Sequence, residues 1–147
     1  MSILKYGLSS KEICNYLKYE KMFLGCFPSN QLPDITSYPC TIIVNSEKSN
    51  HPGGHWVALF LQKEYSFYFD SFGLPVLEED IFNYLKRCYK KITYNNHCIQ
   101  DIESVSCGLY CISFVKHVHS VKTYTSFIQN FSLVHLKSND LKVLHLL

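Results

Sequence analysis

The sequence lacks long apolar runs and has little charge of either sign. Charged residues make up 18% of its 147 residues, and the formal net charge of +2 is too small to indicate a nucleic-acid-binding protein by itself. No apolar run approaches the roughly 18–20 residues that cross a bilayer. The N-terminal stretch MSILKYGLSS also lacks the apolar core of a signal peptide. We therefore expect an intracellular protein that does not bind membranes.

A regular disulfide framework is also missing. The cysteines are odd in number, seven, and lie without regular spacing at positions 14, 26, 40, 88, 98, 107 and 111. Small secreted scaffolds instead have paired cysteines at close spacing. We expect mostly free thiols in a reducing compartment. The sequence assigns no role to Cys88, Cys98 or Cys111.

The composition is that of a folded chain. Apolar residues make up 47% of the sequence, and aromatic residues, mainly 11 Tyr and 10 Phe, make up 15%. Such a chain can bury a core of useful size. No internal repeat, low-complexity tract or linker divides it. We predict one domain over residues 1–147 and expect a monomer.

The hydrophobic pattern predicts both strands and helices. Residues 40–45, 55–61 and 65–70 are predicted strands, and the three residues between the last two predict an antiparallel hairpin. Residues 77–91 are a predicted helix with acidic residues at its start and basic residues at its end, as the helix dipole prefers. Residues 107–119 repeat apolar side chains at helical spacing. These elements indicate the α+β class.

The remaining elements are predicted from weaker patterns. Ser9 and Glu12 suit the capping box of a first helix. Residues 28–34 are a predicted loop and 92–96 a short strand. Helical segments are expected near 124–136 and over 140–147. The predicted inner face of the first helix consists of Ile13, Tyr16 and Leu17. That of the 77–91 helix consists of Ile81, Tyr84, Leu85 and Cys88.

Cys107 is the first candidate for chemistry. It stands directly before Gly108 at the start of a predicted helix. Unpaired N–H groups and a partial positive charge at a helix start favour the thiolate, which is the nucleophilic form of cysteine. Gly108 has no side chain, so a substrate backbone could approach closely. For any single cysteine, a small core residue is the simpler interpretation.

The predicted hairpin brings a base and an acid together. His55 begins one strand and Asp70 ends the next, so the two lie opposite each other in a tight antiparallel pair. A carboxylate that accepts one ring N–H fixes the histidine tautomer and leaves the other nitrogen for Cys107. Taken separately, His55 is more simply interpreted as a strand-end residue and Asp70 as a turn residue.

Gln100 supplies a candidate oxyanion donor. It lies seven positions before Cys107, and a loop of that length can fold back toward the thiol. Its amide N–H₂ and the backbone N–H of Cys107 would then be the two donors that acyl transfer requires.

The ordered set resembles the adenain-like cysteine proteases, which are the adenovirus maturation protease and its relatives in the clan of the ubiquitin-like-protein proteases. The similarity covers about residues 4–119 and is found in IVNSEKSNHPGGHWVALFL, YFDSFGLP and QDIESVSCGLYC. The tail TYTSFIQNFSLVHLKSNDLKVLHLL resembles the short tails of virophage and Polinton-type proteases. The resemblance implies a central mixed or antiparallel sheet packed between helices.

The resemblance also implies roles for individual residues. His55 would be the base, Asp70 its orienting acid, Gln100 the oxyanion donor and Cys107 the nucleophile of a thiol endopeptidase. Trp56 would pack beside the site and, with Gly54 and Gly108, contact substrate. No cofactor or metal is implied.

Partners and location follow from the same resemblance. Substrates in this clan often have Gly before the cut bond, and the viral members cleave capsid and core precursors during virion maturation. This implies a location in the host cytoplasm, a viral factory, the nucleus or the virion. The adenovirus enzyme is activated by a viral peptide and by DNA, so both are candidate partners, with Cys88 or Cys98 for a peptide disulfide and KRCYKK (86–91) for DNA.

Three alternatives stay open. The chain could remove ubiquitin-like modifiers from proteins, since the same four residues serve that reaction. It could be an inactive binding module that kept the fold. A zinc site could also form from Cys107, Cys111, His117 and His119, although their spacing does not match the usual paired Cys knuckles.

Overall fold

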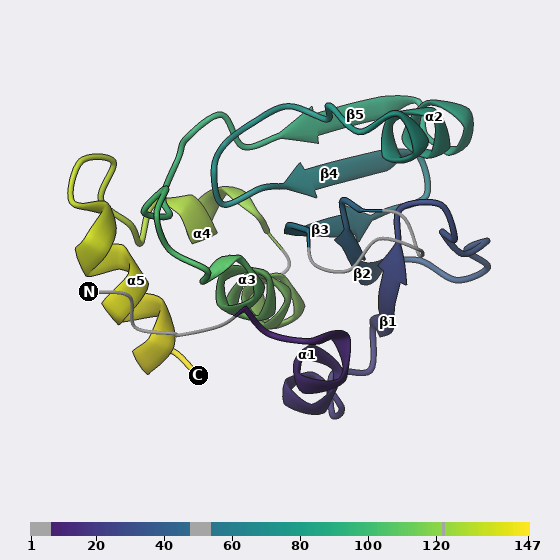
Figure 1. Cartoon of the computed structure of the whole chain (residues 1–147). Helices are drawn as coiled ribbons and strands as arrows, with labels where there is room; N and C mark the ends of the chain where they lie inside the picture. The colour runs from purple at the N-terminus through teal and green to yellow at the C-terminus, as the bar shows by residue number, and fades with distance from the viewer. Residues whose placement is uncertain (1–6, 48–53, 122) are drawn as a thin grey trace.

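Five strands form a single mixed sheet in the computed structural model, which describes residues 7–47, 54–121 and 123–147 (Figure 1). The elements are α1 (Ser10–Tyr16), β1 (Phe23–Pro28), β2 (Cys40–Asn45), β3 (Trp56–Leu61), β4 (Tyr65–Phe69), α2 (Glu79–Cys88), β5 (Lys91–Tyr94), α3 (Cys107–Val121), α4 (Thr125–Ile128) and α5 (Leu136–His145). The fold is α+β, as predicted. Residues 48–53, part of the segment IVNSEKSNHPGGHWVALFL before His55, lie outside the described residues.

The strands are ordered β1-β2-β3-β4-β5 across the sheet. The central strands β2, β3 and β4 pair antiparallel, whereas the edge strands β1 and β5 each pair parallel with their neighbours. In the β3–β4 hairpin, Ala58 lies opposite Phe69 and Leu61 lies opposite Ser66. The start of β3 and the end of β4 therefore meet at the same end of the sheet.

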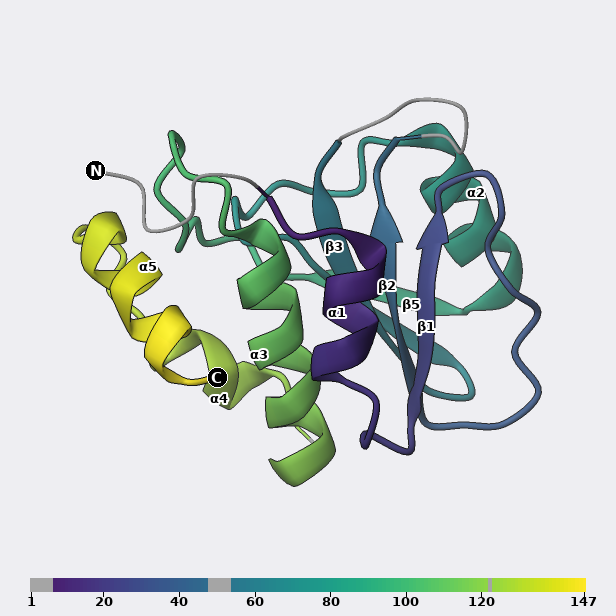
Figure 2. The same ribbon diagram turned by 60° about the horizontal axis from the view of Figure 1, so that its bottom comes forward.

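Helices cover both faces of the sheet (Figures 1 and 2). Every residue of β3 is buried, as expected for a strand with packing on both sides. On one face, α1, α3 and the C-terminal helices enclose a core with Ile43, Ala58 and Phe69 of the sheet. On the other face, α2 packs on Ile42 and Leu59. The sheet thus lies between two helical layers, as the resemblance implied.

Helix α3 runs through the larger core. Its predicted inner residues are all buried, namely Leu109, Ile112, Val115 and Val118. Phe114 is fully buried on the same helix and stacks on Phe69 of β4, with ring centroids 4.7 Å apart and planes 4° from parallel. A helix that is apolar on several sides is typical of a core position. Packing against the sheet therefore fixes α3, and with it the residue at its start.

Two helix starts agree with the sequence. The predicted capping box is present: the Glu12 N–H donates to Ser9 Oγ over 3.1 Å, and the Ser9 N–H donates to Glu12 Oε1 over 3.0 Å. In α2, Glu79 and Asp80 lie in the first turn and Lys86 and Arg87 in the last, which suits the helix dipole.

Strand β1 was not predicted from the sequence. Gly25 within it has a φ of 136°, and the pairing with β2 is irregular between Phe23 and Cys26. Glycine and an irregular register weaken the alternating pattern by which strands are recognised. The tail also differs, because the helix expected over 124–136 is limited to Thr125–Ile128, and the last helix begins at Leu136 and not at 140.

The prediction that Tyr16 and Cys88 lie on the inner faces of their helices was wrong. Tyr16 is 45% exposed, and Cys88 is also exposed. Each is the last residue of its helix, where the chain turns back toward the sheet. The residues that directly follow them, Leu17 and Tyr89, are buried.

Within residues 7–47, 54–121 and 123–147, no helix has the length and apolar character needed to span a membrane.

Phe114→Ala is expected to lower the free energy of unfolding by about 3–5 kcal/mol, because it removes a fully buried ring and leaves a cavity. Urea denaturation followed by circular dichroism measures the change. Tyr19→Ala is the control, since Tyr19 is 86% exposed and its loss should change stability by less than about 0.5 kcal/mol. Equal effects of the two substitutions would contradict this account of the core.

Candidate active site

The β3–β4 hairpin places an imidazole beside a carboxylate. His55 directly precedes β3 and Asp70 directly follows β4. The Nε2 atom of His55 lies 2.6 Å from Oδ1 of Asp70. The Asp70 side chain is almost fully buried, whereas about a quarter of the His55 side chain remains exposed. The imidazole therefore has one nitrogen on the acid while its ring still reaches the surface.

Asp70 is held by its neighbours as well as by His55. Its Oδ1 also accepts from the Phe72 backbone N–H over 2.9 Å. The Asp70 N–H donates to Asn95 Oδ1 over 3.0 Å, and its carbonyl accepts from Asn95 Nδ2 over 2.7 Å. Asn95 directly follows β5 and is buried. Asn95 thus fixes the Asp70 backbone, while the Phe72 N–H and His55 hold its carboxylate. Sequence analysis had not identified Asn95.

The His55 ring and backbone are also restrained. The ring stacks on Phe72 with centroids 4.8 Å apart and planes 23° from parallel. The His55 N–H donates to Ser46 Oγ over 3.2 Å, and the Ser46 N–H donates to the His55 carbonyl over 2.8 Å. These contacts hold the ring in one orientation.

Cys107 is the first residue of α3 and interacts with the His55 ring. Because Nε2 of His55 lies on Asp70, Nδ1 is the ring nitrogen left for the sulfur. Cys107 is 8% exposed. The N–H groups of the first turn of α3, a helix of 15 residues, lie at the same place. The imidazole of His55 therefore lies between the thiol of Cys107 and the carboxylate of Asp70 and contacts both.

The surroundings of His55 favour its protonated form. Burial lowers the pKa of the imidazole, but the hydrogen bonds to Asp70 and to Cys107 outweigh this effect and raise the pKa to about 9. At neutral pH the ring is then a cation next to the sulfur. Such a cation stabilises a thiolate, the form of cysteine that attacks carbonyl carbon.

Gln100 lies in the same site with its amide oriented. Its Oε1 accepts from Ser71 Oγ over 2.5 Å. Its Nε2 donates to the carbonyl and to Oγ of Ser104, each over 3.0 Å. The Gln100 side chain is thus held between the residue after Asp70 and the loop that leads to Cys107. Its role as an oxyanion donor stays a prediction.

These residues line one cleft with a volume of about 620 Å³. Its walls are Gly7, Leu8, Ser9, Ser10, Asn45, Gly54, His55, Trp56, Phe72, Gln100, Ser104, Val105 and Cys107. Trp56 Nε1 donates to the Leu8 carbonyl over 2.9 Å and so fixes the N-terminal wall. Trp56 and Gly54 are both at the cleft, where the resemblance put them.

Gly108 is not among the residues that line this cleft, and its contact with substrate stays a prediction. A Cβ on Gly108 would lie 3.2 Å from Cβ of Leu8 and 3.5 Å from Cδ1 of Ile13. The space beside Gly108 is therefore filled by α1 and the residues before it. The glycine therefore permits close packing of α3 against this segment.

Gly73 explains the sharp turn after Asp70. It has a φ of 73°, and a Cβ there would lie 2.5 Å from the carbonyl carbon of His97. Only glycine fits a left-handed backbone that approaches another chain segment so closely. This turn therefore packs directly against the segment that leads to Gln100.

The residues proposed for zinc do not converge. His117 Nε2 lies 2.7 Å from Ser126 Oγ, and His119 lies between Thr41 and Glu20. Cys111 is fully buried, and burial raises the pKa of its thiol well above the usual value. Among the described residues no group of three or more His, Cys, Asp or Glu is arranged to hold a metal ion.

Comparisons with known proteins support the fold. Thirteen chains of solved structures match this chain, among them the crystal structure of the selenomethionine ASFV pS273R protease, with a TM-score of 0.53 and 17% sequence identity. The match covers 93% of this chain and 66% of the protease, so this chain spans just under two thirds of that protein's length. The likeness shows that this chain shares its fold with that protease, and it does not single out the adenovirus-type branch.

No protein-family model matches the sequence, and no curated protein matches it.

The pKa of His55 predicts a stability change with pH. Because the folded-state pKa of about 9 exceeds the ordinary value of 6.5, the folded chain binds more protons between these values. The stabilisation from protonated His55 should be fully present below pH 6.5 and be lost as the pH rises to about 9. Urea unfolding between these pH values measures it. His55→Gln should remove this part of the pH dependence, and identical pH slopes in both proteins would contradict the prediction.

Proposed function

We propose that the chain is a cysteine endopeptidase that cuts peptide bonds at small or Gly-containing motifs. The observation that supports this most is the convergence of Cys107 and His55 on one open cleft, with Asp70 bound to the imidazole from behind. A buried structural cysteine requires neither an ordered imidazole nor a carboxylate behind it. The arrangement is that of a nucleophile, its base and the group that orients the base.

In the proposed reaction, the Cys107 thiolate attacks the carbonyl carbon of the scissile bond. The imidazolium of His55 gives its proton to the leaving amine as the C–N bond breaks, which leaves a thioester. His55 then takes a proton from water as the water oxygen attacks the thioester carbonyl, and the C–S bond breaks to release the acid product and re-form the Cys107 thiolate beside the imidazolium. Asp70 holds Nε2 of His55 throughout and stabilises its positive charge.

The negative oxygen formed in each step would be stabilised by Gln100 and by the N–H groups at the start of α3. Both amide hydrogens of Gln100 currently donate to Ser104. We propose that an oxyanion replaces one of these contacts, while Ser71 keeps the amide oriented through Oε1.

The proposed substrates are viral structural precursors, such as capsid or core proteins. The architecture shared with a viral protease supports a viral role. The preference for small residues rests on the resemblance to proteases whose substrates often have Gly before the cut bond.

Substitution of the four residues should separate their roles. Cys107→Ala should abolish cleavage without unfolding the domain, and His55→Ala should nearly do so. Asp70→Asn should slow cleavage less, and Gln100→Ala should lower kcat by on the order of 10²-fold. Cys88→Ala is the matched control, because Cys88 is an exposed cysteine away from the cleft. Normal activity in Cys107→Ala would disprove the proposal.

The assay is incubation with a library of Gly-containing peptides, with the products identified by mass spectrometry. Selective cuts after small-residue motifs are the expected outcome. Cleavage of folded modifier fusions alone would instead identify an enzyme that removes ubiquitin-like proteins.

Alkylation distinguishes an enzyme from an inactive module of the same fold. A small iodoacetamide-type reagent at neutral pH should modify Cys107 faster than Cys88, although Cys88 is more exposed, because only Cys107 has an imidazolium beside it. His55→Ala should remove this advantage. Peptide mapping by mass spectrometry gives both rates in one sample, and an inactive module would show no dependence on His55.

A further inference from the structure

We propose that the C-terminal helix α5 positions Gln100 for catalysis through Asn139 and Asp140. The inference rests on the proposed function. Both residues lie in the C-terminal tail, beyond the part of the chain that resembles the adenovirus enzyme, and both are polar yet buried, with 3% and 4% exposure. Their hydrogen bonds are made to the residues on either side of Gln100. They are positioning residues, because neither lines the cleft.

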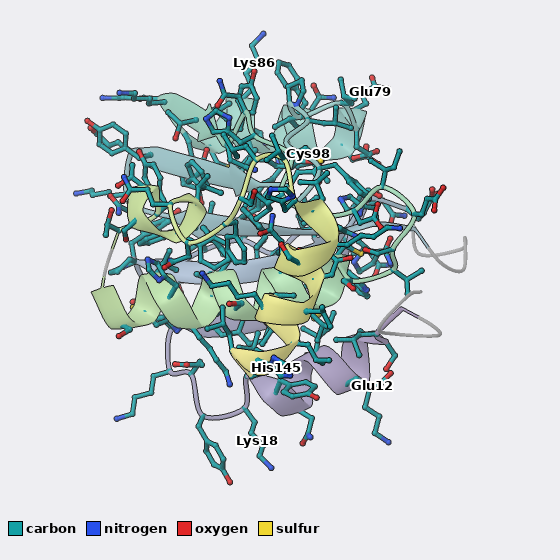
Figure 3. The ribbon with its side chains drawn as sticks, turned by 90° about the vertical axis from the view of Figure 1, so that its left-hand side faces the viewer. Glu12, Lys18, Glu79, Lys86, Cys98 and His145 are labelled. Atoms are coloured by element: carbon teal, nitrogen blue, oxygen red, sulfur yellow. The ribbon has the colours of Figure 1, made fainter. Side chains whose placement is uncertain are left out.

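Helix α5 crosses α3 on the outside of the larger core. Figure 3 shows α5 in front of α3, with one end of α5 near Cys98 and the other at His145. Asn139 and Asp140 belong to the first turns of α5, which begins at Leu136. The start of the helix is therefore the part that meets the segment containing Gln100.

Asn139 holds the residue before Gln100. Its Nδ2 donates to the Ile99 carbonyl over 2.9 Å and to the Ser132 carbonyl over 2.6 Å. Its Oδ1 accepts from the Ser132 N–H over 2.9 Å. All of these groups are on the backbone, so the contacts fix the path of the chain and not only side-chain packing. Asn139 thereby ties the Ile99 carbonyl to the turn before α5.

Asp140 links the segment of Gln100 to the nucleophile helix. Its Oδ1 lies 2.6 Å from the Tyr110 hydroxyl, which donates to it, and 3.5 Å from the Asp101 N–H. Tyr110 is fully buried and lies one turn after Cys107 on α3. The same hydroxyl is 3.1 Å from the Ile99 carbonyl. One carboxylate therefore connects the helix of the nucleophile with the residue that follows Gln100.

Ser71 completes the arrangement from the opposite side. Its carbonyl accepts the N–H groups of Ile99 and Gln100, over 2.9 and 3.1 Å. Its hydroxyl donates to Gln100 Oε1. Because Ser71 follows Asp70, Gln100 lies between the acid of the site on one side and α5 on the other. The position of the amide relative to Cys107 is then set by contacts at both ends.

A merely structural role does not explain well why buried polar residues occupy positions 139 and 140. Burying a carboxylate costs desolvation free energy, and apolar residues of similar volume would join α5 to α3 at less cost. Val143, fully buried on the same helix, already provides apolar packing. The buried polar groups instead fix the orientation of the segment around Gln100, because hydrogen bonds restrict geometry more than apolar contacts do.

The test is a set of variants in the full chain. Asp140→Ala should lower kcat for the cleaved peptide about tenfold with little change in KM, because misplacement of a catalytic group by about 1 Å can cost up to 10²-fold. It should have no further effect in a Gln100→Ala background. Alkylation of Cys107 should keep its wild-type rate. Val143→Ala is the matched control, since it removes apolar packing of α5 but none of the hydrogen bonds from Asn139 and Asp140 to the Ile99–Asp101 segment, and it should keep kcat.

A structural readout keeps the inference independent of activity. The side-chain amide resonances of Gln100 in ¹⁵N NMR spectra should shift in Asp140→Ala and stay in place in Val143→Ala. If Asp140→Ala does not fold, Asp140→Asn replaces it, and the shift of the Gln100 resonances and the loss of kcat are expected to be smaller. Unchanged Gln100 resonances, or an equal loss of kcat with and without Gln100, would overturn the inference. Lack of cleavage by the wild type, with the resonance shift present, would disprove the proposed function alone.

Discussion

The antiparallel pairing of β3 and β4 is the constraint on which the site depends. Ala58 opposite Phe69 sets the register, and this register alone brings His55 and Asp70 to the same end of the sheet. A slip of one residue would reverse the face of every side chain in one strand. Apart from Tyr65, both strands are buried on both faces, so such a slip would exchange the side chains that pack in the two cores. The core therefore enforces the contact between imidazole and carboxylate.

The nucleophile reaches this pair through a different kind of constraint. Helix α3 is fixed along its length by aromatic packing, including Phe114 on Phe69, and only its first residue meets the cleft. Strand β4 takes part in both contacts, since Phe69 packs on α3 and the next residue is Asp70. The position of the sulfur relative to the imidazole is thus a result of core packing.

Sequence patterns predicted the parts of the fold that repeat. The apolar runs of β2, β3 and β4 and the periodic face of α3 are local, and they were predicted within one or two residues. Strand β1 lacked that periodicity because of Gly25 and its irregular pairing. For Gly108, the spacing could not show that Leu8 would fill the adjacent space.

Polar residues that support the site were missed for a related reason. Asn95 and Asp140 act on segments 25 and 39 positions away, and nothing near them in the sequence marks the partner. A polar residue in a loop or a short helix is usually solvated, so its type alone does not distinguish it. His55, Asp70, Gln100 and Cys107 were selected because the predicted hairpin, helix start and loop length connected them, and because their order resembled a known family.

The turn at Gly73 has a consequence for finding distant relatives. Its left-handed backbone touches the chain near His97, so a side chain there would push apart the two segments that hold the acid and the amide. The interval between Asp70 and Gly73 is therefore a steric requirement of this architecture and does not depend on overall similarity. An acid followed three positions later by glycine, after a buried strand, offers a search pattern for chains whose identity has fallen as low as 17%.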